Sequence, residues 1–181
     1  THECSSAASD VYKRQVGTSD DIIAKEFKNI LPIAEKINCK IAIENHFAFP
    51  SDRMANIIKL VDEEYLGACL DVANSICAGE WPDETIDCLK DYTINLHIKD
   101  YQFSIDPYGV GFSIEGVPLG KGLTNVAGLL SKFKDKDISV IYEHWLPWPG
   151  NFEDARKNED IWTIESIAYL KSLKSEYNQT L

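Results

Sequence analysis

The sequence has fewer basic than acidic residues, it lacks paired cysteine motifs, and it has no long apolar run. Its 181 residues include 18 Lys and Arg against 29 Asp and Glu, for a formal net charge of −11. Nucleic-acid binders need a basic surface, so nucleic acid is not an expected partner. The five cysteines are an odd number without Cys-x-x-Cys spacing, which predicts neither a disulfide framework nor a zinc knuckle.

No apolar stretch is long enough to cross a bilayer, and the N-terminus lacks the basic and apolar segments of a secretory signal. We therefore expect a cytoplasmic protein without a membrane partner and with reduced thiols. The content of 44% hydrophobic and 26% charged residues is that of an ordinary globular domain.

Residues 1–15 are predicted to be a non-native leader, and residues 16–181 a partial domain. The leader has no clear period and does not lead into the next element. The string from Asp10 to Gln15 resembles the translation of a transposon-end tag used in sequencing libraries.

Four strand-like apolar runs each end on a side chain that can bind a divalent metal. They are Lys40–Glu44, Leu66–Asp71, Thr93–His97 and Ile138–Glu143. The carboxyl ends of neighbouring parallel strands meet on one face, so Glu44, Asp71, His97 and Glu143 are expected to converge there as a four-ligand site. Oxygen ligands with one nitrogen favour Mn, Mg or Co, and Zn also fits.

Helices are expected between these strands. Helical spacing of apolar residues and Ser-Asp starts predict helices over 19–38 and 51–61, and shorter or later helices are expected over 74–78, 82–90, 125–134 and 159–174. Residues 100–124, with five glycines, are expected to form one long functional or mobile loop, and residues 144–151 a second loop.

The alternation of helix and strand predicts parallel strands with crossover helices. One face of each strand is small or polar and the other is mainly branched aliphatic, which suits a barrel wall better than an open sheet. A complete (β/α)8 barrel takes about 250 residues. The predicted fold class is therefore α/β, a truncated TIM barrel that comprises its carboxyl half.

Several segments resemble the xylose isomerase-like TIM barrels, and more narrowly the sugar phosphate isomerase/epimerase group. They are Ile41–His46, Leu70–Asn74, His97–Asp100, Tyr142–Trp145 and the loop Gly116–Gly122. The resemblance covers residues 16–181 and implies that the strands correspond to about strands five to eight of the barrel.

The resemblance implies a metal held by Glu44, Asp71, His97 and Glu143, with Glu44 and Glu143 also acting as catalytic acid and base. The implied activity is a metal-dependent isomerase or epimerase for a small sugar or sugar phosphate. A divalent metal stabilises an enediolate as a Lewis acid, and one carboxylate removes the proton that another returns.

Nearby residues are candidates for substrate binding. Asn74 stands where many relatives carry a histidine, and Phe103 where ketose epimerases often carry an arginine, which makes the ketose 3-epimerase assignment the least supported part of the resemblance. Other candidates are Lys99, His46, His144 and Trp145. The competing interpretations are a salt bridge for Lys99, loop packing for the histidines and Trp145, and a helix N-cap for Asp71.

Three alternative functions stay open. One is a dehydratase for an inosose or another keto acid, which would use the same metal and base. A DNA-repair endonuclease is disfavoured, because four histidines are few for a multi-zinc cluster. In the third alternative, this chain is a catalytically inactive fragment. Its exposed edge strands would then favour aggregation or pairing into a homo-oligomer.

Overall fold

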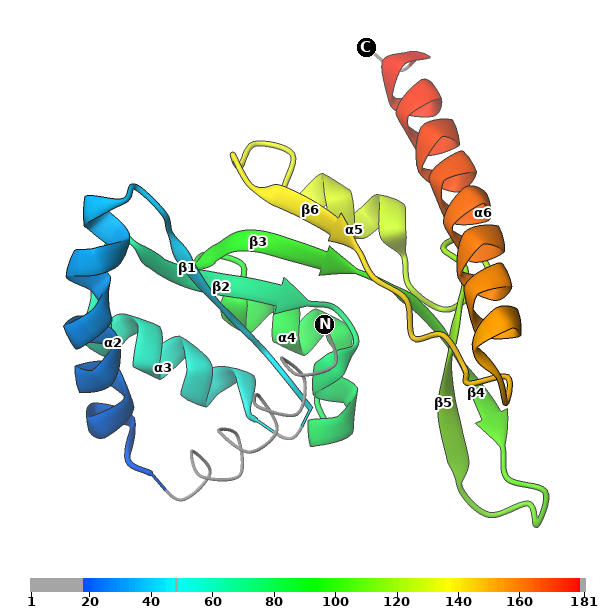
Figure 1. The fold of residues 1–181 in the computed structure, drawn as a ribbon, viewed down its shortest axis with the longest axis horizontal. Helices are drawn as coiled ribbons and strands as arrows, with labels where there is room; N and C mark the ends of the chain where they lie inside the picture. Colours follow the sequence, from blue (N-terminus) through cyan, green and yellow to red (C-terminus); the bar gives the residue numbers. More distant parts are fainter. Residues whose placement is uncertain (1–17, 48, 180–181) are drawn as a thin grey trace. The chain divides into compact units, whose positions relative to one another are not determined.

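A computed structural model describes residues 18–47 and 49–179 (Figure 1). The predicted leader, residues 1–15, lies outside the described residues. The chain divides into two compact units, residues 1–96 and 97–181, and each is described by itself.

The first unit alternates helices and strands. In chain order its elements are α2 (Asp20–Lys36), β1 (Ile41–Glu44), α3 (Ser51–Val61), β2 (Leu66–Asp71), the 3-10 helix η1 (Asn74–Ala78), α4 (Pro82–Leu89) and the first four residues of β3 (Thr93–Ile98). β1 pairs with β2 in parallel, from Ile41 opposite Leu66 to Glu44 opposite Cys69. Because their starts are in register, Glu44 and Asp71 both reach the same end of the paired strands.

Apolar burial explains this arrangement. Every residue of β2 is buried, and α3 and α4 both contact it (Figure 1). α3 turns its apolar stripe inward, with Met54, Ile57, Ile58 and Val61 each at most 6% exposed. The helix ends at Val61; the next residue, Asp62, has a left-handed backbone and its N–H donates to Ile58 O. Helix 51–61 and strand 66–71 are confirmed with their predicted bounds.

The second unit contains the end of β3, β4 (Asp100–Ile105), β5 (Phe112–Val117), α5 (Val126–Lys132), β6 (Ser139–Tyr142) and α6 (Phe152–Gln179). The strand order of the four-stranded sheet is β1-β2-β3-β6. Glu143 follows β6 directly, and its backbone N–H donates to Ile98 O at 3.0 Å.

The prediction of one long loop over 100–124 was wrong. β4 and β5 form an antiparallel hairpin in that region, with Asp100 opposite Val117 and Ile105 opposite Phe112. Alternation of Tyr101, Phe103 and Ile105 with polar residues is a strand signal, and the glycines obscured it. The simple helix–strand alternation is therefore interrupted between β3 and α5.

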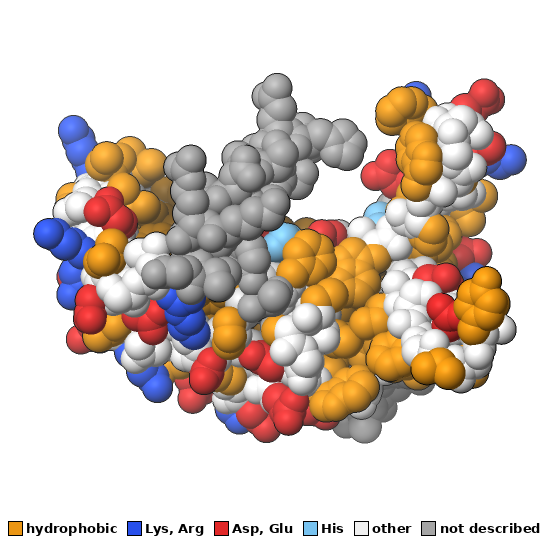
Figure 2. All heavy atoms as spheres, turned by 90° about the horizontal axis from the view of Figure 1, so that it is seen from below, with side chains coloured by type: hydrophobic (Ala, Val, Ile, Leu, Met, Phe, Trp, Pro, Cys, Tyr) orange, Lys and Arg blue, Asp and Glu red, His pale blue; other side chains and the backbone are white. Residues whose placement is uncertain are grey.

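The last helix begins earlier than predicted, at Phe152 rather than near residue 159. Its first turns are rich in charge and lack an apolar stripe, so they gave no periodic signal. None of the described helices is long and apolar enough to cross a membrane. Figure 2 shows acidic, basic and apolar side chains interspersed on the face that it presents.

Candidate metal centre

Glu44 and Asp71 end the two paired strands of the first unit, and two asparagines hold them. The Asn74 side-chain amide donates to Glu44 Oε1 at 3.1 Å and to the backbone oxygen of Asn45 at 3.1 Å. Asn45 is fully buried. Its amide donates to the backbone oxygen of Asp71 at 2.8 Å, and its own oxygen accepts from the Asp71 N–H at 2.7 Å. These paired bonds fix where β2 ends.

The Asp71 carboxylate is buried and oriented by the turn that follows it. Oδ1 accepts from the backbone N–H groups of Ala73 and Asn74, both at 2.9 Å. Asp71 therefore caps this turn, as the alternative interpretation of the sequence predicted. Since one oxygen serves the turn, ligation through the other is compatible with capping.

Two cationic or ionisable side chains hold Glu143 in the second unit. His97 Nδ1 and Lys99 Nζ each lie 3.1 Å from Glu143 Oε2. The hydrogen bond with His97, aided by the charge of Lys99 and opposed by burial, lowers the pKa of Glu143 from 4.5 to about 2. Lys99 is 1% exposed, and its ammonium lies 4.8 Å from the centroid of the Trp145 ring, a cation–π distance.

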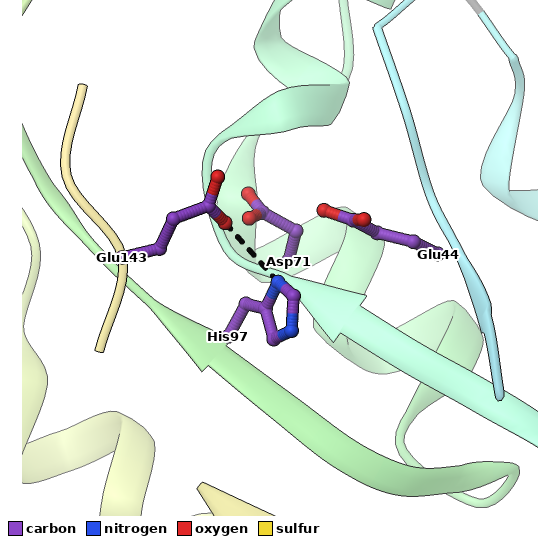
Figure 3. A group of neighbouring side chains, drawn as sticks. All are labelled: Glu44, Asp71, His97 and Glu143. Atoms are coloured by element: carbon purple, nitrogen blue, oxygen red, sulfur yellow. Dashed lines mark hydrogen bonds and ion pairs between the residues drawn. The ribbon is translucent and has the colours of Figure 1, made fainter. Parts of the chain in front are cut away.

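The four predicted ligands form one group. One ligand atom from each of Glu44, Asp71, His97 and Glu143 lies within 4.8 Å of every other (Figure 3). Three carboxylates with one imidazole fit a hard divalent cation in charge and donor type.

The remaining predicted site residues have protein contacts. His46 packs edge-on against Phe47, with ring centroids 4.0 Å apart. His144 uses both ring nitrogens, with Nδ1 2.6 Å from Tyr142 Oη and Nε2 3.1 Å from Thr163 Oγ1. Substrate binding by these two histidines and by Asn74, Lys99 and Trp145 stays a prediction.

Asp100 organises the glycine-rich loop, a role that the sequence analysis did not assign. Its buried carboxylate accepts backbone hydrogen bonds of 2.8–2.9 Å from Tyr101, Gly120, Gly122 and Thr124. A Cβ at Gly122 would lie 2.3 Å from Asp100 Oδ1, so this close approach requires glycine. Three of these partners lie 20 to 24 residues further along the chain, so no local signal in the sequence indicated this role.

The sequence matches the family described as Xylose isomerase-like TIM barrel over residues 5–173. It is 34% identical over 155 residues to 3-oxo-isoapionate decarboxylase of Pectobacterium atrosepticum, which covers 84% of this chain and 56% of the relative. The chain thus belongs to the xylose isomerase-like TIM barrel family, and it spans little more than half of that relative's length.

Solved structures agree on the fold. A xylose isomerase domain protein from Planctomyces limnophilus matches with a TM-score of 0.66 and 18% identity, covering 84% of this chain and 53% of that one. A xylose isomerase-like TIM barrel protein from Mycobacterium smegmatis in complex with magnesium matches at 0.60 and 20%, covering 82% and 51%. A probable 3-DHS dehydratase from Bacillus anthracis matches at 0.59 and 18%, covering 81% and 55%.

Proposed function

We propose that this chain carries the metal-binding and acid–base residues of an enzyme that acts next to the carbonyl of a small oxo sugar or oxo sugar acid. The observation that carries the proposal is the group of Glu44, Asp71, His97 and Glu143, whose ligand atoms lie within 4.8 Å of one another. A bound Mn, Mg or Co ion, or Zn, would act as a Lewis acid on the substrate's oxygens.

The two glutamates are the candidates for proton transfer. Glu143 is held ionised by His97 and Lys99, and Glu44 receives a hydrogen bond from the neutral amide of Asn74. The two carboxylates thus have different hydrogen-bond partners, and one could accept a proton that the other returns. This arrangement supports the isomerase or epimerase activity predicted from the sequence.

Decarboxylation of a 3-oxo acid is the second candidate reaction. The 34% identity to 3-oxo-isoapionate decarboxylase favours it. Loss of CO₂ beside a carbonyl leaves the same kind of negative charge as removal of a proton, so the same residues serve both reactions. Dehydration of a keto acid, the alternative from the sequence, begins with the same removal of a proton.

A first experiment tests the metal site. We expect excess Mn(II) at about a hundred times its dissociation constant to stabilise the folded chain by roughly 2.7 kcal/mol, measured as a shift in thermal melting. Asp71→Ala should abolish the shift, and Asp135→Ala, an exposed acid, should retain it. Equal behaviour of wild type and Asp71→Ala would refute the site.

A second experiment separates the reactions. The Mn(II)-loaded chain is incubated in D₂O with neutral oxo sugars and with 3-oxo sugar acids, and the products are followed by NMR. Deuterium at the carbon beside the carbonyl indicates proton transfer, and release of CO₂ indicates decarboxylation. Metal binding without turnover would support the interpretation that this chain alone is inactive.

A further inference from the structure

A directed chain of hydrogen bonds lies behind Glu143, on residues that the proposed chemistry does not use. The backbone N–H of Leu119 donates to Ser166 Oγ at 3.0 Å, and Ser166 Oγ donates to Tyr142 Oη at 2.6 Å. Tyr142 Oη lies 2.6 Å from His144 Nδ1, and His144 Nε2 lies 3.1 Å from Thr163 Oγ1. Leu119 and Ser166 are at most 2% exposed.

The Ser166 hydroxyl accepts from the Leu119 N–H and donates to Tyr142 Oη. We assign the remaining Tyr142 proton to the bond with His144 Nδ1. This assignment selects the His144 tautomer with the proton on Nε2, which faces Thr163 Oγ1.

This chain anchors both sequence neighbours of Glu143. Tyr142 and His144 flank it, and both are tied to α6 through Ser166 and Thr163, which lie three residues apart and so share one face of the helix. Successive side chains of an extended segment point to opposite sides, so anchoring Tyr142 and His144 directs Glu143 the other way, toward His97 and Lys99.

We propose that Tyr142 and His144 are positioning residues, which act through Ser166 and Thr163 to hold the Glu143 carboxylate against His97. This positioning of Glu143 applies to the metal-free protein. The effect of Tyr142 and His144 on metal affinity rests on the proposed function.

Side-chain nitrogen NMR of the metal-free protein tests the placement directly, because the sequence has only four histidines. In wild type, we expect one ring with the proton on Nε2, assigned to His144 by its loss in His144→Gln. Tyr142→Phe, which removes only the hydroxyl, should shift the His97 nitrogen resonances as well. Tyr108→Phe, at an exposed hairpin position, is the matched control and should shift neither ring.

Mn(II) titration of the same proteins measures the consequence. Loss of an outer-shell partner weakens metal binding by about 10–100-fold, and we expect about 10-fold for Tyr142→Phe and for Ser166→Ala. Unchanged His97 resonances in both variants would overturn the positioning role, whatever the metal result. Shifted His97 resonances in a wild-type protein that binds no Mn(II) would support the positioning role and refute the proposed metal site.

Discussion

The two units of the chain hold their candidate ligands by different kinds of bond. In the first unit, Asn74 and Asn45 fix Glu44 and the Asp71 backbone through neutral amides. In the second, His97 and Lys99 hold Glu143 through ionisable groups. Hydrogen bonds between neutral amides and the backbone respond little to salt and pH, whereas charge pairs respond to both.

This difference indicates that the two sets of contacts have different roles. The Asn45 amide sets the backbone geometry of Asp71 with little dependence on salt or pH. The charged contacts of Glu143 keep this carboxylate ionised, and they make its position sensitive to salt and pH. Single substitutions in each network test this difference.

The largest loss of stability is expected from Asn45→Ala. It removes a buried amide that makes two bonds to the Asp71 backbone and one of 2.9 Å to Ser75 Oγ, so three buried polar groups each lose one bond. Each such buried polar group costs about 1–3 kcal/mol, so we expect a loss of about 3 kcal/mol in urea unfolding, the same at low and high salt. Asn56→Ala, which removes an exposed bond to Asp20, should cost less than about 1 kcal/mol.

A negative charge placed in the amide network should make the first unit sensitive to a bound cation. Asn74→Asp replaces the donor to Glu44 by a third carboxylate beside Glu44 and Asp71, and we expect a loss of about 2 kcal/mol in metal-free protein. Excess Mn(II) should recover most of that loss, because a cation attracts the added charge. The control is Asn125→Asp, whose oxygen still accepts from the Gly128 N–H. Equal losses with and without Mn(II) would argue against a cation at this position.

The ligand positions could be predicted because they depend on local pattern. Apolar runs that end in Glu44, Asp71 and His97 place these side chains at strand ends without knowledge of any distant contact. The roles of Asn45 and Asp100 could not be found in this way. Asn45 bonds to Asp71, 26 residues away, and Asp100 bonds to Gly122, 22 residues away; only the folded chain brings such pairs together.

The errors in the fold have a related cause. Glycine and charged residues are weak local signals, so the hairpin of β4 and β5 was mistaken for a loop and the start of α6 was missed. In both segments, the backbone pairing of the hairpin or the continuation of the helix outweighs the propensity of single residues.

A moderate effect is expected from Lys99→Met, which removes the charge but keeps most of the side-chain volume. Removing one partner of a fully buried ion pair costs about 3–5 kcal/mol, and because the Glu143 side chain is 41% exposed, we expect about 1–2 kcal/mol. The difference from wild type should shrink at high salt. Lys121→Met, which breaks an exposed pair with Glu165, should change stability by less than about 1 kcal/mol. If the loss of stability in Lys99→Met does not depend on salt, the contacts of Glu143 are no more electrostatic than those of Asp71.

The last prediction concerns pH. The bond from His97 and the charge of Lys99 lower the pKa of Glu143 from 4.5 to about 2 in the folded protein. A lowered folded-state pKa adds stability that is fully present above pH 4.5 and is lost as the pH falls from about 4.5 to about 2. Glu143→Gln lacks this contribution, so its unfolding free energy should approach that of wild type across this window when both are measured in EDTA. Glu153→Gln, an exposed carboxylate, should follow wild type throughout. A constant gap between wild type and Glu143→Gln from pH 6 to pH 3 would mean that His97 and Lys99 do not hold Glu143 by charge.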